Sequence, residues 1–306
     1  MRDLLLDSER RLQFAGHETF PLRLLWLKKA HDAIVEDGPE GRTFHEQSAI
    51  ARFGVGKNMV GAIRHWSIAS GMVKAEGVSH TPTPIGRRIL DVGGLDPFLE
   101  QPATLWLVHA ALAGAAAPCT TFYYAFNLLN QVEFDRETLH QALVDLARRR
   151  SVRATPDTIK RDVEVFLRSY VGRGAEGGED AAEPLLAELG LLRDARLSGQ
   201  YAFVRGPQPS LPDAIFAVHL QRFWVREKQP PTLSAEAIAY APGSPGRVFK
   251  MDEDSVVTRL MRLGDLTRGA QVWTDTAGLR QVGFDPEGVR EVDLIEAAYG
   301  RPAVAA

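Results

Sequence analysis

The sequence predicts a mainly α protein made of tandem winged-helix units, each a helix-turn-helix with a small β-hairpin, packed with additional helices. Three observations predict this fold. Apolar residues recur at helical spacing through most of the chain, residues that cap or end helices interrupt them at short intervals, and alternating segments surround glycine-containing turns. We place an N-terminal helix and the first unit in residues 1–95, a helical region with a second unit in 96–210, and a third unit in 211–306.

The first unit lies between Thr43 and Leu90. Thr43, with Glu46 three positions later, has the spacing of a capping box, which predicts the start of a helix. This helix should end at Gly54, because glycine tolerates the left-handed conformation that closes many helices. A second helix follows as far as Gly71, and a short hairpin comes after it. Two helices joined by a tight turn allow the second one to enter the major groove of DNA.

The charge of residues 43–90 supports contact with DNA. This segment has six Lys and Arg residues against two Asp and Glu residues, in a chain whose formal net charge is -3. Its positive face is therefore local, and phosphate groups are the ligand that such a face attracts. The predicted DNA contacts are Lys57, Asn58, Arg64, His65, Lys74, Arg87 and Arg88. The same geometry also serves for dimerisation and protein docking, which remains an alternative.

The segment FAGHETFPLRLLWLKK, residues 14–29, places polar residues directly before an expected helix that Thr19 caps and Pro21 begins. Free N–H groups at a helix N-terminus can bind an anion such as phosphate. This predicts a ligand or phosphate site formed by His17, Glu18, Thr19 and Arg23. Simple capping, with the polar side chains in solvent, explains the same pattern.

The middle of the chain begins with two apolar helices, expected over residues 102–114 and 120–131. His109 lies within the first, and no histidine or acid stands three or four positions away, which favours an interior histidine over a metal ligand. Cys119, the single cysteine, is expected to be a small buried side chain. One cysteine also excludes an internal disulfide and a multi-cysteine zinc site.

The second unit is predicted between Asp135 and Gly206. Asp135 should cap one helix, and Thr155 followed by proline should begin the next. Positions 148–173 hold eight basic residues against three acidic ones, and three of the basic residues lie on the outer face of the second helix. These three are further predicted DNA contacts: Lys160, Arg161 and Arg168. A hairpin that turns at Ser198-Gly199 would complete the unit.

The third unit closes the chain. Ser234 and Asp252 are expected to cap two helices, and residues 271–284 alternate around Ala277-Gly278 as a hairpin does. The loop between the two helices is long for a helix-turn-helix. Common ancestry of the three units therefore stays open, and each can equally be a structural spacer.

Composition limits the function classes. A chain of 306 residues with 45% hydrophobic and 25% charged residues is typical of a globular protein with two or three domains. There is no run of about 18 apolar residues for a membrane span, and the first residues are too charged for a secretory signal. We therefore expect a cytoplasmic protein that does not contact membranes.

Enzyme motifs are incomplete. Gly54-Val55-Gly56-Lys57 lacks the second glycine spacing of a phosphate loop, and no G-x-S-x-G is present. Neither His17-Glu18 nor His45-Glu46 has the second histidine of a zinc-protease helix. No cluster of carboxylates suits metal-assisted hydrolysis. We therefore predict no catalytic residue, no metal and no cofactor, while a metal-dependent DNA-processing enzyme with a site near His17 and Glu18 remains an alternative.

Two motifs carry a resemblance to a known family. F-x-G-H-E-T-F-P-L-R-x-x-W-L-K-K at residues 14–29 and F-G-V-G-K-N-M-V-x-x-I-x-x-W at residues 53–66 resemble the bacterial domain-of-unknown-function 4007 family, in the same order and at the same separation. Members of that family are typically encoded near DNA sulfur-modification enzymes. The resemblance implies a role in phosphorothioate DNA modification or an associated defence system, and it implies no catalytic residue. If the family recognises DNA, the contacts it implies are Lys57, Asn58, Arg64 and His65, with His17, Glu18 and Arg23 as a polar site of unassigned role.

Together these observations predict a non-catalytic recognition or recruitment subunit of a bacterial phosphorothioate modification or anti-phage defence system. Its expected partners are double-stranded DNA and the other proteins of a modification or defence complex. A homodimer is expected if the DNA target is palindromic. The alternatives are a winged-helix scaffold that docks a modification enzyme, and the metal-dependent enzyme described above.

Overall fold

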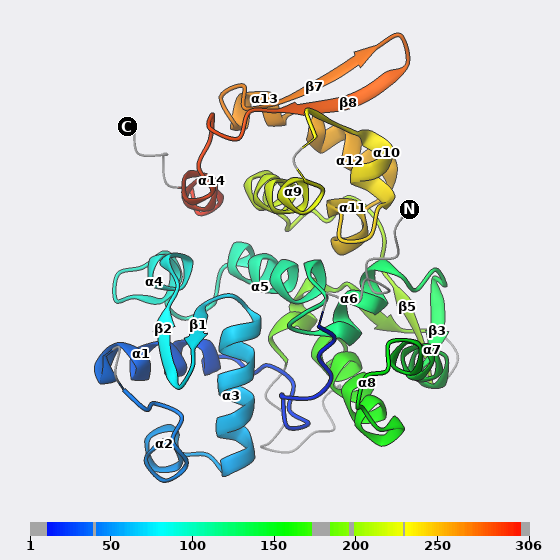
Figure 1. Cartoon of the computed structure of the whole chain (residues 1–306). Coiled ribbons are helices and arrows are strands. Elements are labelled where there is room, and N and C mark those ends of the chain that lie inside the picture. Colours follow the sequence, from blue (N-terminus) through cyan, green and yellow to red (C-terminus); the bar gives the residue numbers. More distant parts are fainter. Residues whose placement is uncertain (1–10, 39–40, 173–183, 196–198, 229, 301–306) are drawn as a thin grey trace.

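The computed structural model describes residues 11–38, 41–172, 184–195, 199–228 and 230–300. Helices predominate, and three small antiparallel sheets accompany them (Figure 1). Within these ranges, no helix combines the length and the apolar character needed to cross a membrane.

The N-terminal helix and the two helices and hairpin of the first unit follow one another in the expected order. These elements are α1 (Trp26–Asp37), α2 (Glu46–Phe53), α3 (Lys57–Ala69), β1 (Val73–Glu76) and β2 (Ser79–Pro82). Helices α1 and α2 both pack on α3, and the hairpin folds back beside α3 and α1 (Figure 1). Gly54 ends α2 with φ 64°, as the sequence predicts.

Two of the predicted helix starts in residues 1–95 are wrong, whereas α3 begins after Gly56. The Thr43 hydroxyl does not cap α2, which begins at Glu46, but donates to Oδ2 of Asp37 at 2.7 Å. Helix α1 begins at Trp26, because Thr19 has φ 69° and Leu25 has φ 65°, both left-handed conformations that a helix cannot contain. The polar segment before α1 is therefore a separate structure rather than a helix cap.

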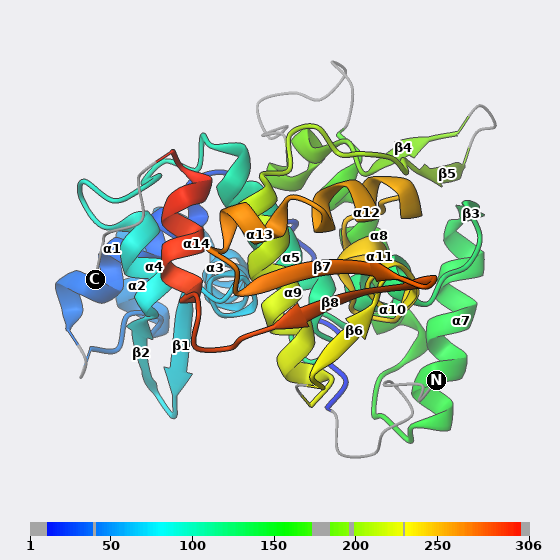
Figure 2. The ribbon, with the colours of Figure 1, turned by 90° about the horizontal axis from the view of Figure 1, so that it is seen from above.

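Three connecting helices follow the hairpin: α4 (Pro84–Leu90), α5 (Pro102–Gly114) and α6 (Thr120–Asn127). Helix α5 is buried on nearly all sides, and the C-terminal part of the chain lies over one side of it (Figures 1 and 2). The prediction that His109 is an interior residue is confirmed. Its Nδ1 lies 2.7 Å from the Tyr170 hydroxyl and its Nε2 lies 2.8 Å from the Val248 carbonyl oxygen.

The second unit begins with a strand that the sequence does not predict. Its elements are β3 (Glu133–Asp135), α7 (Arg136–Arg149), α8 (Pro156–Tyr170), the 3-10 helix η1 (Leu185–Leu189), β4 (Leu192–Asp194) and β5 (Gln200–Phe203). Asp135 and Thr155 cap α7 and α8 as predicted, accepting from backbone N–H groups at 2.7 and 3.2 Å. Strands β4 and β5 form the predicted hairpin, although Ser198 lies outside the described residues.

The third unit also contains the predicted caps and hairpin. Its elements are α9 (Asp213–Arg226), β6 (Thr232–Ser234), α10 (Ala235–Tyr240), α11 (Pro245–Val248), α12 (Glu253–Leu260), α13 (Leu263–Leu266), β7 (Gln271–Thr276) and β8 (Leu279–Phe284). Ser234 caps α10 and Asp252 caps α12. A last helix, α14 (Glu291–Ala298), packs on α9 and returns toward the first unit, where Arg88 Nε lies 2.7 Å from Glu296 Oε1.

The second and third units share one topology. Their sheets have the orders β3-β5-β4 and β6-β8-β7, so in each unit a short strand before the helices pairs with the last strand of the hairpin. A single cluster of buried apolar residues runs through all three units, from Leu12 to Ile295. Because the core is shared, the units are held as parts of one body rather than as independent modules.

Candidate nucleic-acid interface

Helix α3 presents a polar face to solvent and an apolar face to the core. Val60, Ile63 and Trp66 are buried, while Lys57 and Arg64 are exposed. Positions 57, 61 and 64 lie within about 60° of one another on a helix of 3.6 residues per turn, so they share the outer face. Asn58 is also exposed, at the N-terminal end of α3.

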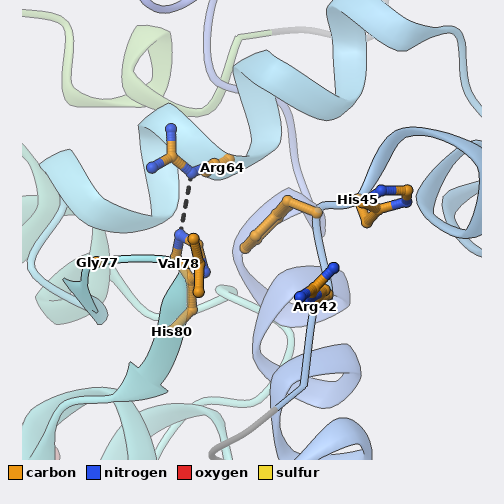
Figure 3. Close-up of a pocket in the computed structure, with 7 residues that line it drawn as sticks. Arg42, His45, Arg64, Gly77, Val78 and His80 are labelled. Atoms are coloured by element: carbon orange, nitrogen blue, oxygen red, sulfur yellow. Dashed lines mark hydrogen bonds between the residues drawn. The ribbon is translucent and has the colours of Figure 1, made fainter.

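A pocket of about 480 Å³ lies between this face of α3 and the β1–β2 hairpin (Figure 3). We call it the hairpin pocket. Arg64 enters it from α3, and its Nε donates to Nε2 of His80 at 3.0 Å. Burial, followed by the Arg64 charge, lowers the pKa of His80, which keeps that ring neutral and able to accept the hydrogen bond. The full lining is Arg42, Phe44, His45, Arg64, Gly77, Val78 and His80.

The polar segment before α1 forms a buried hydrogen-bond network. His17 is 3% exposed, and its Nε2 lies 2.5 Å from Oδ1 of Asp162 on α8. The N–H of Thr19 donates to the other ring nitrogen, Nδ1, at 3.2 Å. Nδ1 therefore carries no proton, and Nε2–H is the donor to the carboxylate. Asp162 also accepts from the N–H of Ala15 at 2.9 Å and from the Thr121 hydroxyl.

This segment joins α3 to α8. The His17 ring stacks on Trp66 of α3, with the ring centroids 5.9 Å apart. Gly16 has φ 100°, and a Cβ atom there would lie 2.7 Å from Nδ1 of His65, so only glycine fits. On the other side, Arg168 of α8 donates to the Thr19 carbonyl oxygen at 2.6 Å. We call residues 14–20 with Asp162 the clasp.

His65 lies on the inner flank of α3, against the clasp, in contrast to the predicted groove contact. Burial, followed by the nearby His17, lowers the pKa of His65 to about 4. Its Nε2 lies 3.8 Å from Sγ of Cys119, and burial raises the pKa of that thiol. The physical reason is position: His65 is one residue beyond Arg64, which rotates it about 100° toward the covered side of the helix.

A second basic pocket, of about 700 Å³, lies on α8 beside the clasp. It brings together Arg161 and Arg168 with Thr19, residues that the sequence assigned to two separate sites. Arg136 at the start of α7 also lines it and was not predicted. Lys160 is exposed next to it on α8. Carboxylates are present here too, since Glu164 and Asp194 line the same pocket.

The other predicted cations lie apart from these two pockets. Lys74 Nζ is 2.6 Å from Glu76 Oε1, and Arg88 pairs with Glu296 as described above. Arg87 is exposed on α4. Arg23 lies over the rings of Phe20 and Trp26, at 5.8 and 5.6 Å from their centroids, and so stabilises the start of α1.

The role of Asp162, one of the three acidic residues in positions 148–173, was not predicted from the sequence. A signal was present. Asp162 stands three positions after Ile159 and four before Phe166, in the middle of the apolar face of α8. An acid at such a position must be paired when it is buried, although the pattern does not identify the partner.

Comparison with known proteins gives one family and two similar solved structures. The family model described as "Protein of unknown function (DUF4007)" matches residues 14–299. A solved structure described as an SspB crystal structure is 27% identical, with a TM-score of 0.84, over 96% of this chain and 90% of that chain. A magnesium ion-bound SspB crystal structure is 25% identical, with a TM-score of 0.81, over 97% of this chain and 98% of that chain. No curated protein matches the sequence significantly.

Proposed function

The chain belongs to the DUF4007 family, and from that premise we propose that it is a DNA-binding recognition or recruitment subunit of a bacterial phosphorothioate modification or associated defence system. Similarity to SspB structures over almost the whole chain supports a role shared with those proteins. We further propose that the three helix-and-hairpin units are winged helices, divided near residues 95 and 210. In this proposal the chain carries no catalytic step itself.

The observation that carries the proposal is uncompensated positive charge beside the hairpin. Arg42 and Arg64 form no ion pair with any carboxylate in the described part of the chain, although the formal net charge is -3. Exposed arginines without acidic partners favour phosphate oxygens, which guanidinium groups bind with two parallel hydrogen bonds. The hairpin and the outer face of α3 thus offer DNA a local positive surface.

In this mechanism, different residues bind the phosphates and contact the base edges. Lys57 and Arg64 hold phosphates and orient the helix, and Asn58 reads base edges in the major groove. The basic pocket on α8 supplies a second set of phosphate contacts, because the clasp holds α8 at a constant position relative to α3. Protein partners and a homodimer on a palindromic target belong to the same proposal.

A mobility-shift titration over several salt concentrations tests this function. We expect the logarithm of affinity to fall linearly with the logarithm of salt, and the double variant Lys57→Ala with Arg64→Ala to reduce the slope by about 2. The matched control removes the same charge from α1 with Lys28→Ala and Lys29→Ala, and should leave the slope unchanged. A flat salt response would contradict DNA binding. Salt-dependent binding that is equal in both double variants would favour the protein-docking alternative.

Removing the charge of Glu18 should strengthen DNA binding, whereas removing Lys57 and Arg64 should weaken it. This carboxylate is exposed beside the outer face of α3, where a Cβ on Gly61 would lie 3.2 Å from its Cγ. Because it repels phosphate, Glu18→Gln should raise affinity for duplex DNA about threefold at low salt, and less as salt screens the charge. Glu100→Gln, also exposed, is the control. Weaker binding by Glu18→Gln would instead assign this carboxylate to base reading.

A resident metal ion does not fit the alternative site near His17 and Glu18. Both ring nitrogens of His17 are hydrogen bonded, so neither has a lone pair directed at a cation. No group of three His, Cys, Asp or Glu side chains suited to a metal occurs among the described residues. The magnesium ion belongs to the similar SspB structure, and no step proposed for this chain uses one.

A further inference from the structure

The hairpin pocket is larger than a phosphate group. Its volume of about 480 Å³ lies in the range of sites that enclose whole small molecules. Two arginines reach it from different elements, Arg64 from α3 and Arg42 from the loop between α1 and α2, and Figure 3 shows them on opposite sides. A phosphate held by Arg64 on one side leaves the space toward Arg42 for the rest of a nucleotide.

Between the arginines the pocket is apolar and aromatic. The Phe44 and His80 rings meet edge to face with centroids 4.9 Å apart, and the hydrogen bond from Arg64 holds His80 in place. Val78, at the tip of the hairpin, is 76% exposed, which leaves an apolar side chain in water at the mouth of the pocket. A planar base would cover these groups, and nucleic-acid bases stack on rings of this kind irrespective of their sequence.

We propose that the hairpin pocket binds a single nucleotide whose base is unstacked, with its phosphate on Arg64 and its base against Phe44, Val78 and His80. A base inside a duplex is covered on both faces by its neighbours, so it reaches such a pocket only when it leaves the stack. The inference rests on the proposed DNA binding and makes it specific: the unit holds an extruded or single-stranded nucleotide beside the groove.

Calorimetric titration of the full chain tests the pocket directly. The probes are deoxyadenosine 5′-monophosphate, deoxyribose 5-phosphate and inorganic phosphate. We expect the nucleotide to bind at least about tenfold more tightly than the sugar phosphate, which is the contribution of one stacked base. Val78→Glu should abolish nucleotide binding without affecting the fold, since the side chain is mostly in solvent. Phe44→Leu should remove the preference for the nucleotide, and Arg64→Gln should weaken all three probes.

The control is Arg280→Gln, which removes an exposed arginine on β8, outside the pocket, and should change nothing. Equal affinity for the nucleotide and the sugar phosphate would overturn the base site and leave only an anion site. Absence of nucleotide binding, with salt-dependent duplex binding intact, would overturn this inference alone. Absence of duplex binding in the mobility-shift titration would overturn the proposed function, so the two failures are distinguishable.

Discussion

Replacing Asp162 with alanine should lower the free energy of unfolding by about 3 to 5 kcal/mol, as is typical when one partner of a buried charged hydrogen-bond network is removed. The carboxylate accepts from the His17 ring, the Ala15 N–H and the Thr121 hydroxyl, and all three donors would lose their acceptor in the interior. Urea unfolding followed by circular dichroism measures the loss. The effect is large because a buried donor without an acceptor keeps its full desolvation cost.

Two variants make this result specific. Asp162→Asn keeps one acceptor oxygen and should lose less stability than the alanine variant. Asp157→Ala removes an exposed carboxylate from the first turn of the same helix, and should cost less than about 1 kcal/mol. If Asp162→Ala unfolds at the same urea concentration as the unmodified protein, the hydrogen bonds of the clasp do not contribute to the stability of the fold.

The clasp also explains how two basic surfaces can act together. His17 stacks on α3 while Asp162 belongs to α8, so one short segment sets the distance between the first and second units. Loosening the clasp should therefore weaken DNA binding even though it removes no predicted contact. That coupling distinguishes a positioning role for His17 from the direct ligand role that the sequence suggested.

Local signals explain what the sequence could predict. The caps at Asp135, Thr155 and Asp252 are each satisfied within three residues, and the hairpin around Ala277-Gly278 depends on its own turn. Such features are visible in a short window because all their partners lie inside it. The buried helix α5 is likewise evident from its nearly continuous apolar composition.

Long-range pairing explains what the sequence could not predict. Strands β3 and β6 have three residues each, too few to show an alternating pattern, and they exist because β5 and β8 pair with them. His17 and Asp162 are 145 positions apart, so no local pattern could join them. Without that contact, the sequence predicts a helix cap from the left-handed turn before α1, and it places His65 on the outer face of α3 rather than against the clasp.

The free energy of unfolding should already fall at mildly acidic pH, above the range in which carboxylates with ordinary pKa values take up protons. Burial lowers the pKa of His65 to about 4 and that of His109 to about 3, and it lowers the pKa of His219 well below its usual value. In the unfolded chain these rings bind protons near pH 6.5. The stability from keeping them neutral is therefore complete above pH 6.5, and it is lost as pH falls toward 4 and then 3.

Proton uptake by three rings on unfolding gives a slope that approaches about 4 kcal/mol per pH unit near pH 5, since each proton contributes about 1.4. Urea unfolding at pH 7, 6 and 5 measures it. His65→Gln should reduce the slope by about one third, because glutamine fills a similar space without titrating. His45→Gln, which removes an exposed histidine, should not change it. If stability is constant between pH 7 and 5, the interior histidines are reached by water and the packing of His65 against Gly16 and Cys119 is not maintained in solution.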